Sequence, residues 1–330
     1  MTDKGEMHMT GRVTDVPGLL VGQAHDEKGR TGVTVILCQP PAVGALDRRG
    51  SAISTRQCDS LLSDHLLSRV DALVFTGGSA FGLDCAAGVM EELAARNIGL
   101  PTPYRAIPIV PTAAIFDVGF GETPAPPTPE LARQALRNAA LEIQEGSVGG
   151  GYGASVGKAL GIGQAMKGGL GTASRRRHDG LIVGALAVVN AWGDVVDPES
   201  GRIVAGARDP EQPHKFLNSA RFLAGGGQVK SAAFENTVLA AVATNAELDK
   251  ASAGLVARMA QAGLARTLYP CHGPFDGDII FALGCGQGKY HPAAVGQMAA
   301  EAMAEAIVRA VRLADGFGLL PDVKGGKISS

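Results

Sequence analysis

The chain has 330 residues, of which 45% are hydrophobic, 5% aromatic and 19% charged, and its formal net charge is −2 at pH 7. This composition is that of a globular protein with a substantial core. It argues against disorder and against the strongly basic surfaces that bind nucleic acid or anionic membranes. We therefore expect neither a nucleic acid nor a membrane as a partner.

The first residues and the cysteines indicate a cytoplasmic protein. Met1–His8 is polar and lacks the apolar segment and small-residue cleavage site of a secretory signal, and no apolar run approaches transmembrane length. The five cysteines are scattered and include no C-x-x-C pair, which favours free thiols over disulfides or a zinc site. We expect no metal and no organic cofactor.

Three strands and two helices are expected in the first half of the chain. The strands are apolar runs bounded by Gly, Asp and Pro, at Leu19–Ala24, Val33–Cys38 and Ala72–Phe75. After Thr76-Gly77-Gly78 the apolar spacing becomes helical, which predicts a helix over Phe81–Arg96. Thr128 and Pro129 are typical of a helix start, and this helix is expected to run to about Ile143.

The second half of the chain adds three strands and two helices. The strands are expected at Leu181–Val189, Val238–Thr244 and Asp278–Leu283. The helices are expected over Asp249–Gly263 and Pro292–Ala314. Three consecutive glycines and their polar neighbours predict a flexible loop over Asn218–Asn236. Because strands and helices do not alternate regularly, the order favours a layered α/β sandwich over a doubly wound parallel sheet.

A glycine-rich stretch at 146–158, G-S-V-G-G-G-Y-G-A-S-V-G-K, raises the possibility of phosphate binding. The Walker A pattern fails at two defining positions, because Tyr152 replaces its first glycine and Ala159 its final hydroxyl. The dinucleotide pattern G-x-G-x-x-A fits, but residues 142–145 before it read as a helix end rather than a buried strand. The stretch therefore indicates a tight turn, with nucleotide binding as the lesser alternative.

Other catalytic templates are not met. The segment Gly77–Phe81 lacks the last glycine of a G-x-S-x-G elbow, no H-E-x-x-H occurs, and the seven histidines are not at metal-ligand spacing. His272 lies near acidic residues. A single histidine in a turn that contains Pro and Gly is interpreted as structural.

Thr237 stands where an N-terminal nucleophile would stand, just after the expected loop and at the start of an apolar strand. In that chemistry the hydroxyl attacks the preceding carbonyl, and water cleaves the resulting ester. The freed α-amine, with an ordinary pKa near 8, then serves as general base for the same hydroxyl. Taken alone, the feature favours an ordinary polar residue at a strand start.

The second candidate feature is Asp276-Gly277-Asp278, directly ahead of another apolar strand. Two carboxylates at this position can orient both a hydroxyl and an ammonium group. The same tripeptide can also be a plain turn into the strand.

Several motifs in fixed order make the chain resemble the DmpA-type aminopeptidases, a family that includes β-peptidyl aminopeptidases, nylon-oligomer hydrolases and a pantetheine hydrolase. The resemblance spans nearly the whole chain. The matching segments are Val16–Gly22, Thr31–Val35, Thr76–Asp84, Gly153–Lys158, Ala187–Asn190, Asn236–Val238 and Phe275–Asp278.

The resemblance implies a single domain with a four-layer αββα sandwich, the fold shared with the ornithine-acetyltransferase type. It implies self-cleavage between Asn236 and Thr237 into an α chain, 1–236, and a β chain, 237–330. Homo-oligomers of these αβ heterodimers are expected, with a small peptide or amide as substrate.

The resemblance also assigns the site residues. Thr237 matches the nucleophile, Asp276 and Asp278 match the pair that positions the nucleophile and its amine, and the D-G-D form is similar to the nylon-oligomer hydrolase branch. Asn190 matches a side-chain amide that helps to hold the oxyanion, and Lys158 matches a lysine near the nucleophile.

One position departs from the family pattern, and alternatives to hydrolysis stay open. Phe116 stands where several members have a tyrosine that lines the site, so any contact of that hydroxyl is lost. An acyltransferase of the ornithine-acetyltransferase type would share the fold, the threonine and the self-cleavage. A nucleotide-binding protein would use the 146–158 loop, and a non-enzymatic module would keep an uncut chain.

Overall fold

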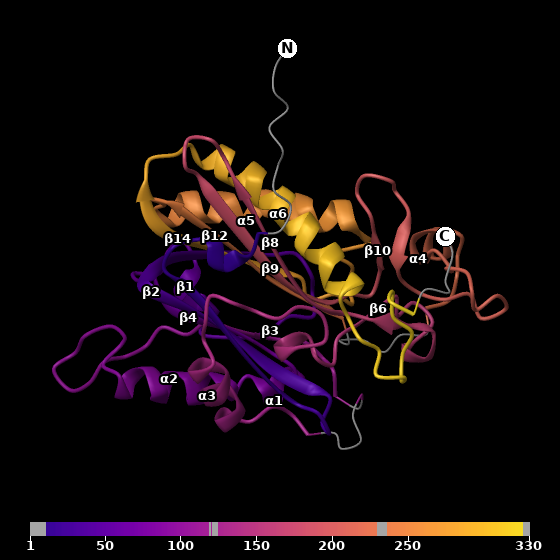
Figure 1. Cartoon of the computed structure of the whole chain (residues 1–330), viewed down its shortest axis with the longest axis horizontal. Helices are drawn as coiled ribbons and strands as arrows, with labels where there is room; N and C mark the ends of the chain where they lie inside the picture. The colour runs from indigo at the N-terminus through magenta and orange to yellow at the C-terminus, as the bar shows by residue number, and fades with distance from the viewer. Residues whose placement is uncertain (1–10, 119, 121–124, 230–235, 326–330) are drawn as a thin grey trace, which may run out of the picture.

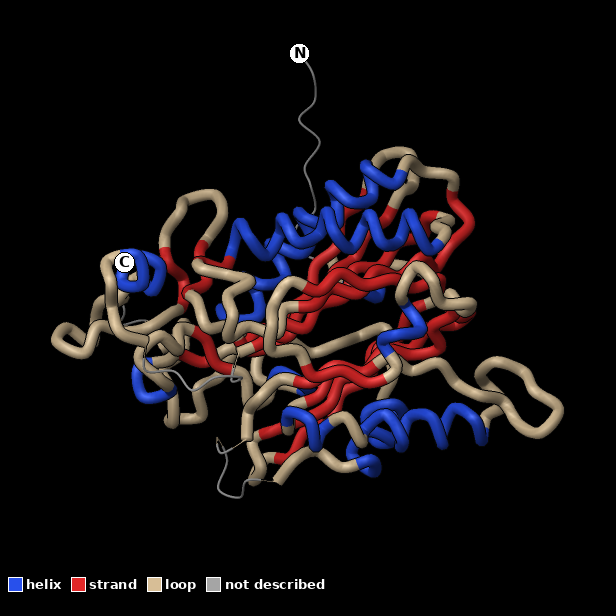
Figure 2. The backbone as a smooth tube through the Cα atoms, turned by 180° about the vertical axis from the view of Figure 1, so that it is seen from behind, coloured by secondary structure: helices blue, strands red, loops and turns tan. Residues whose placement is uncertain are grey.

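The computed structural model describes residues 11–118, 120, 125–229 and 236–325. It has four layers, with two facing layers of strands between two layers of helices (Figure 1, Figure 2). One outer face is covered by α2 (Cys85–Ala95) and α3 (Pro129–Arg137), the other by α5 (Lys250–Thr267) and α6 (Pro292–Arg312). The αββα sandwich expected from the sequence is confirmed.

Nine strands form one hydrogen-bonded sheet, which folds into two layers because the long strand β2 (Thr31–Arg48) belongs to both. The first half of β2 pairs with β1 and β4, whereas residues 43–48 pair with β14. One layer contains, besides β2, the strands β1 (Leu19–Asp26), β3 (Ser54–Arg56), β4 (Arg69–Thr76) and β5 (Thr112–Ala114). The other contains β8 (Gly169–Arg176), β9 (Ile182–Asn190), β12 (Thr237–Ala246) and β14 (Ile279–Gly288).

Three apolar cores separate the four layers, because successive residues of a strand face opposite sides of a sheet. On β2, Val35 packs toward α2 and α3 while Ile36 faces the other sheet layer. On β12, Val238 packs toward α5 and α6 while Leu239 faces the space between the sheet layers. Thr237 therefore begins a strand that is buried on both faces, which fixes its position.

All six predicted strands are present, but the helix expected from Thr128 to Ile143 is shorter than predicted. Thr128 caps it as expected, its hydroxyl accepting a hydrogen bond from the Leu131 amide at 3.2 Å. α3 nevertheless ends at Arg137, because Ala140 pairs with the backbone of Val21 in β1. Residues 142–145 consequently form no regular helix or strand, so their interpretation as a helix end is wrong.

Two other segments differ from the sequence prediction. The helix expected over Phe81–Arg96 is divided into α1 (Ser79–Gly82) and α2. Part of the loop expected over Asn218–Asn236 is the helix α4 (Ser219–Ala224). The buried Asp194 carboxylate fixes its start by accepting hydrogen bonds from the amide and hydroxyl of Ser219, both at 2.7 Å. Residues 230–235 of that expected loop lie outside the described residues.

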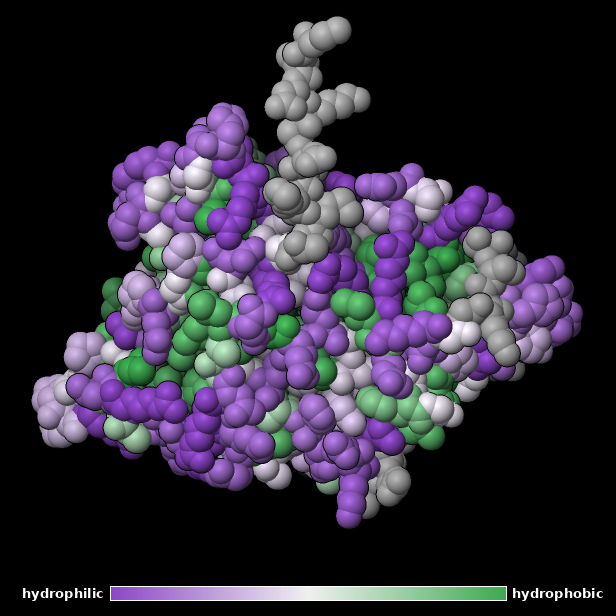
Figure 3. Space-filling view, in the orientation of Figure 1, coloured by the Kyte–Doolittle hydropathy of each residue, from purple (hydrophilic) through white to green (hydrophobic). Residues whose placement is uncertain are grey.

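The remaining short strands lie near the glycine-rich stretch and at one end of the sandwich. They are β6 (Ser155–Val156), β7 (Met166–Lys167), β10 (Asp194–Val196), β11 (Ile203–Ala205) and β13 (Leu268–Tyr269). On the face seen in Figure 3, hydrophilic residues predominate and hydrophobic residues show between them in several places. Within the described ranges, no helix has the length and apolar character needed to cross a membrane.

Candidate active site

Thr237 and Asn190 lie side by side because β9 and β12 are antiparallel neighbours. Thr237, the first residue of β12, is the register partner of Asn190, the last residue of β9. Both residues are buried, with 2% and 0% of their surface exposed. The Thr237 hydroxyl donates a hydrogen bond to the carbonyl oxygen of Asn236 at 2.5 Å. The hydroxyl thus lies against the peptide bond that precedes it.

The D-G-D segment lies next to the same peptide bond, because β12 and β14 are parallel and begin together. Asp276 pairs with Asn236 in a parallel bridge, and the Gly277 amide donates to the Asn236 carbonyl oxygen at 2.8 Å. A Cβ atom at position 277 would lie 2.6 Å from the Thr237 Oγ1. Only glycine leaves room for that hydroxyl here.

The two aspartates have different surroundings. Asp278 accepts hydrogen bonds from the Val238 amide through Oδ1, at 3.0 Å, and from His272 through Oδ2. Asp276 accepts from the amides of Gly273, at 2.9 Å, and Trp192, at 3.4 Å. Burial, and after it the charge of Asp278, raises the pKa of Asp276 to about 7. Asp276 can therefore gain or lose a proton near neutral pH.

His272 belongs to this cluster, although the sequence interpretation made it a structural residue. Its backbone amide and its ring Nδ1 both reach Asp278 Oδ2, at 3.1 and 3.0 Å. Burial lowers the pKa of His272, but its hydrogen bonds and charge interactions with Asp278 and Cys271 outweigh burial and raise that pKa to about 10. The sequence signal was the position of His272 six residues before Asp278, across a turn.

Lys158 and Ser155 fix the orientation of the Asn190 amide. Lys158 Nζ donates to Asn190 Oδ1 at 2.8 Å and to its backbone oxygen at 3.2 Å, and the Ser155 amide donates to the same Oδ1 at 3.0 Å. The amide oxygen is thereby committed as an acceptor, so Nδ2 faces the other way as a donor. It contacts the Phe116 carbonyl oxygen at 3.2 Å.

The glycine-rich stretch surrounds a positively charged side chain, that of Lys167, rather than presenting a site for an anion. Its amides donate within the protein, for example from Gly150 to Thr34 Oγ1 at 3.0 Å. Its carbonyl oxygens at Gly151 and Ala154 instead accept from the buried Lys167 Nζ, at 3.3 and 2.8 Å. A phosphate site requires free amide groups directed at the ligand, and this arrangement gives nucleotide binding no support.

Asp117 is a buried carboxyl near Lys167 that sequence reasoning missed. It accepts hydrogen bonds from Thr31 Oγ1 at 2.8 Å and from the Gly78 amide at 2.7 Å. Burial raises the pKa of Asp117 to about 6 and lowers the pKa of Lys167 to about 7. The segment Thr76–Asp84, whose Gly78 has a φ of +78°, thus supports Asp117.

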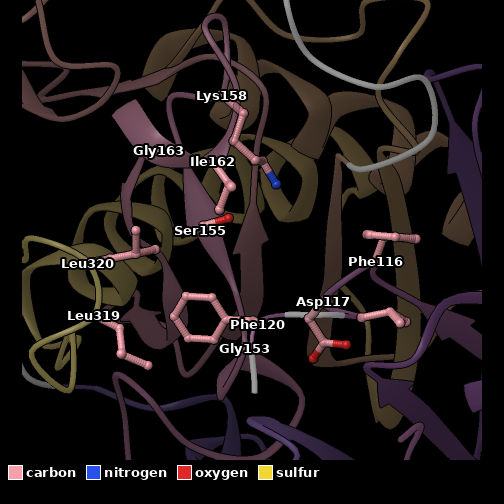
Figure 4. Close-up of a pocket in the computed structure, with 11 residues that line it drawn as sticks. Phe116, Asp117, Phe120, Gly153, Ser155, Lys158, Ile162, Gly163, Leu319 and Leu320 are labelled. Carbon is pink, nitrogen blue, oxygen red and sulfur yellow. The ribbon is translucent and has the colours of Figure 1, made fainter. Parts of the chain in front are cut away.

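A cavity of about 370 Å³ opens beside Lys158 (Figure 4). Three of its lining residues, Phe116, Ser155 and Lys158, also contact Asn190, which connects the cavity to the register partner of Thr237. In Figure 4, Leu319 and Leu320 lie on the side opposite Phe116. The lining consists of Phe116, Asp117, Val118, Phe120, Gly153, Ser155, Lys158, Ile162, Gly163, Leu319 and Leu320.

The described residues offer no evident metal site. In that part of the chain, no group of three or more His, Cys, Asp or Glu side chains is placed to hold a metal ion. The five cysteines are free thiols. The chemistry available to the cluster is therefore a hydroxyl, two carboxyls, an imidazole, an amide and an ammonium group.

Comparison with known proteins places this site in a family context. The model of peptidase family S58 matches residues 11–319. An uncharacterized aminopeptidase of Mycobacterium leprae is 40% identical over 293 residues, covering 83% of this chain and 78% of the relative. A 6-aminohexanoate-oligomer endohydrolase of Paenarthrobacter ureafaciens is 30% identical over 329 residues, covering 93% and 89%.

Solved structures with the same fold extend the comparison. The L-aminopeptidase D-Ala-esterase/amidase of Ochrobactrum anthropi, described as a variant of the Ntn hydrolase fold, superposes with a TM-score of 0.70 at 20% identity. That match covers 96% of this chain and 89% of the other. A Pyrococcus horikoshii protein gives a TM-score of 0.71 at 21% identity, covering 94% and 89%.

Proposed function

The chain belongs to peptidase family S58 and is a hydrolase, and on that premise we propose that it is a self-processing amidase with Thr237 as its N-terminal nucleophile. The observation that carries the proposal is the pair of contacts on one carbonyl oxygen. The Asn236 oxygen accepts from the Thr237 hydroxyl at 2.5 Å and from the Gly277 amide at 2.8 Å. Cleavage there yields chains 1–236 and 237–330.

Self-cleavage begins with attack of the Thr237 Oγ1 on the carbonyl carbon of Asn236. A C–O bond forms, the C–N bond to Thr237 breaks, and the hydroxyl proton passes to the departing nitrogen. The Gly277 amide stabilises the negative charge that develops on the carbonyl oxygen. Water then cleaves the ester, giving an Asn236 carboxylate and a free Thr237 amine and hydroxyl.

Substrate turnover repeats this chemistry on an external amide. The Thr237 amine, whose ordinary pKa is near 8, takes the hydroxyl proton as Oγ1 attacks the substrate carbonyl, and passes it to the amine that leaves when the substrate C–N bond breaks. The Asn190 amide, oriented through its Oδ1 by Lys158, donates to the oxyanion, and the acyl-enzyme is then hydrolysed by water. Asp276 and Asp278 position the hydroxyl and the amine. No step requires a metal or an organic cofactor.

The substrate is proposed to be a short peptide, an amino-acid amide or ester, or a related small amide. The cavity beside Lys158 is large enough for a small acyl group and has mostly apolar walls. Relatives named as aminopeptidases and as a 6-aminohexanoate-oligomer endohydrolase support this class. Phe116 contributes a ring without a hydroxyl to the wall, so substrate contacts there are apolar. We also propose assembly into homo-oligomers of αβ heterodimers.

Hydrolysis is tested with the purified enzyme and a panel of amino-acid p-nitroanilides, a β-amino-acid amide and a linear 6-aminohexanoate dimer. Wild type and a control with an exposed hydroxyl removed, Ser200→Ala, should turn over at least one substrate, and Thr237→Ala none. Addition of an amine acceptor separates hydrolysis from acyl transfer, because a transferase would form the new amide as its main product. Turnover by Thr237→Ala at the wild-type rate would refute the assignment.

A further inference from the structure

Lys167 has no direct part in the proposed reaction, but its contacts lead to the amide that holds the substrate oxyanion. It is the register partner of Ser155 in the β6–β7 pair, and 0% of its surface is exposed. We propose that Lys167 is a positioning residue: its ammonium group holds the peptide between Ala154 and Ser155, and that peptide holds the side-chain amide of Asn190. The inference rests on the proposed function, because it concerns the donor to the substrate oxyanion.

The ammonium group of Lys167 is bound by three backbone oxygens. Nζ donates to the carbonyl oxygens of Ala154 at 2.8 Å, Gly168 at 3.0 Å and Gly151 at 3.3 Å. An ammonium group has three N–H donors, so these acceptors match its capacity. Burial of a charge is costly unless its polar partners are in place. Nζ and the three carbonyl oxygens therefore hold one another in position.

One peptide group connects Lys167 to Asn190. The carbonyl oxygen of Ala154 accepts from Lys167 Nζ at 2.8 Å and from the Gly168 amide at 2.9 Å. The nitrogen of the same peptide belongs to Ser155, and its N–H donates to Asn190 Oδ1 at 3.0 Å. Because a peptide group is planar, fixing its oxygen also fixes the direction of its N–H. A positive charge at the oxygen polarises the group and strengthens that N–H as a donor.

The backbone around this peptide is closely packed. A Cβ atom at Gly168 would lie 2.2 Å from the Val189 carbonyl oxygen and 3.0 Å from the Ser155 nitrogen. Ser155 also lines the cavity beside Lys158 (Figure 4). A shift of the peptide at this point therefore moves the cavity wall and the donor to Asn190 together.

The Asn190 amide is thus held by two donors with separate supports. Lys158 Nζ donates directly to Oδ1 at 2.8 Å, and the Ser155 amide donates to the same atom with Lys167 behind it. A flipped amide would direct its NH2 group at both donors, which is unfavourable. Without Lys167 the Ser155 support is weakened, so the Asn190 Nδ2 is less well aligned with a developing oxyanion.

The two proposed reactions of Thr237 use different oxyanion donors, which makes the role of Lys167 testable. In self-cleavage the donor is the Gly277 amide, 2.8 Å from the Asn236 oxygen, and in substrate turnover it is Asn190. Within the described part of the chain, Lys167 Nζ has no hydrogen bond to Gly277 or Asn236. Loss of Lys167 should therefore slow turnover and spare self-cleavage, whereas a damaged fold would slow both.

The experiment measures both reactions in Lys167→Met. Turnover is followed with the substrate of the panel above that wild type hydrolyses fastest, and kcat is expressed per released chain 237–330, so that unfolded, uncut protein does not count. We expect kcat to fall roughly 10- to 100-fold, because loss of an oxyanion donor itself costs about 10²- to 10³-fold. KM and the rate of self-cleavage should stay within about twofold of wild type, because Lys167 acts through a contact made in the transition state of turnover.

Lys250→Met is the matched control. Lys250 Nζ also donates to three carbonyl oxygens, those of Ser60 at 3.1 Å, His65 at 2.9 Å and Leu67 at 2.8 Å. None of these residues contributes to the candidate site. Loss of this ammonium group should change neither kcat nor the rate of self-cleavage.

A double-mutant cycle tests whether Lys167 acts through Asn190. Asn190→Ala should still cleave itself, because Gly277 supplies the oxyanion donor for that reaction. In the Asn190→Ala chain, Lys167→Met should lower kcat by less than about twofold, since the amide that it positions is already absent.

Three results would overturn the inference. They are an unchanged kcat in Lys167→Met, an equal loss of kcat and of self-cleavage, and a loss of kcat in the Asn190→Ala chain as large as in the wild type. Failure of Asn190→Ala to cleave itself would also count against it. If Lys167→Met does not fold, Lys167→Gln, which keeps an uncharged donor, is assayed in the same way with sucrose to favour the folded state.

Failure of both Lys167 variants to fold would overturn the inference, because Lys167 would then be a structural residue. Failure of the proposed function is recognised separately. A wild-type chain that does not cleave itself refutes that function before any Lys167 variant is compared.

Discussion

Replacement of Gly277 by alanine should slow self-cleavage without abolishing the nucleophile. The added Cβ would lie 2.6 Å from Thr237 Oγ1 and 2.6 Å from the Ala52 carbonyl oxygen, whereas such contacts essentially never fall below 3.0 Å. The Cβ and the hydroxyl must therefore move apart by at least 0.4 Å, the difference between 2.6 and 3.0 Å. Because a misplacement of about 1 Å costs about 10²-fold in rate, we expect Gly277→Ala to cut itself roughly 10- to 100-fold more slowly.

The rate is measured by pulse-labelling the chain in cell-free translation and following the uncut band on a denaturing gel. Gly254→Ala is the matched control, because a Cβ at this helical position meets nothing closer than 3.7 Å. Urea unfolding of uncut chains separates the clash with the hydroxyl from the clash with the Ala52 carbonyl. In the Thr237→Ala chain, which lacks Oγ1, Gly277→Ala should lower the free energy of unfolding less than it does in the Thr237→Val chain, where a methyl group replaces the hydroxyl. Cleavage of Gly277→Ala at the wild-type rate would refute this account of the glycine.

Three further predictions concern the buried charges. Lys158→Met should lower kcat about 10²- to 10³-fold by releasing the Asn190 amide, and ATP or NAD should not raise the Tm before or after the change; nucleotide-dependent stabilisation would contradict this. Lys167→Met should destabilise the fold by about 2–4 kcal/mol in urea unfolding, because it leaves buried carbonyl oxygens without their donor; an unchanged midpoint would contradict it. Burial raises the pKa of Asp117 from 3.8 to about 6, so its stabilising contribution is complete below pH 3.8 and is lost as the pH rises through 6. Asp117→Asn should remove this fall in the free energy of unfolding with pH. A fall unchanged from wild type would count against the assignment.

Six of the strands could be predicted from local pattern and the four-layer αββα order from the family resemblance, but the end of one helix could not be predicted. Apolar runs identified six of the seven strands of eight or more residues in the two sheet layers, but not β8 (Gly169–Arg176), whose sequence is rich in small and polar residues. The helix after Thr128 was extended to Ile143 because its spacing stays compatible with a helix. It ends at Arg137 because Ala140 pairs with Val21. That pairing joins distant parts of the chain, and no local pattern reports it.

The candidate site was predicted largely through the family resemblance. The match to peptidase family S58 over residues 11–319 confirms the family. Spacing alone could not bring Asn190 beside Thr237, because their proximity depends on the antiparallel pairing of β9 and β12. His272 was dismissed as a turn residue, since nothing in sequence shows that a positive φ directs its ring toward Asp278. The contact of the Lys167 ammonium group with the glycine-rich stretch could not be predicted either, because composition does not distinguish a loop that presents amides from one that presents carbonyls.

The most direct test of the central claim is N-terminal sequencing of the smaller band obtained when purified protein is incubated and separated under denaturing conditions. The proposed mechanism predicts two chains, 1–236 and 237–330, with the second beginning Thr-Val-Leu-Ala. Thr237→Ala should remain a single chain under the same conditions. A wild-type chain that stays whole after prolonged incubation, or a new terminus at any residue other than Thr237, would contradict the account.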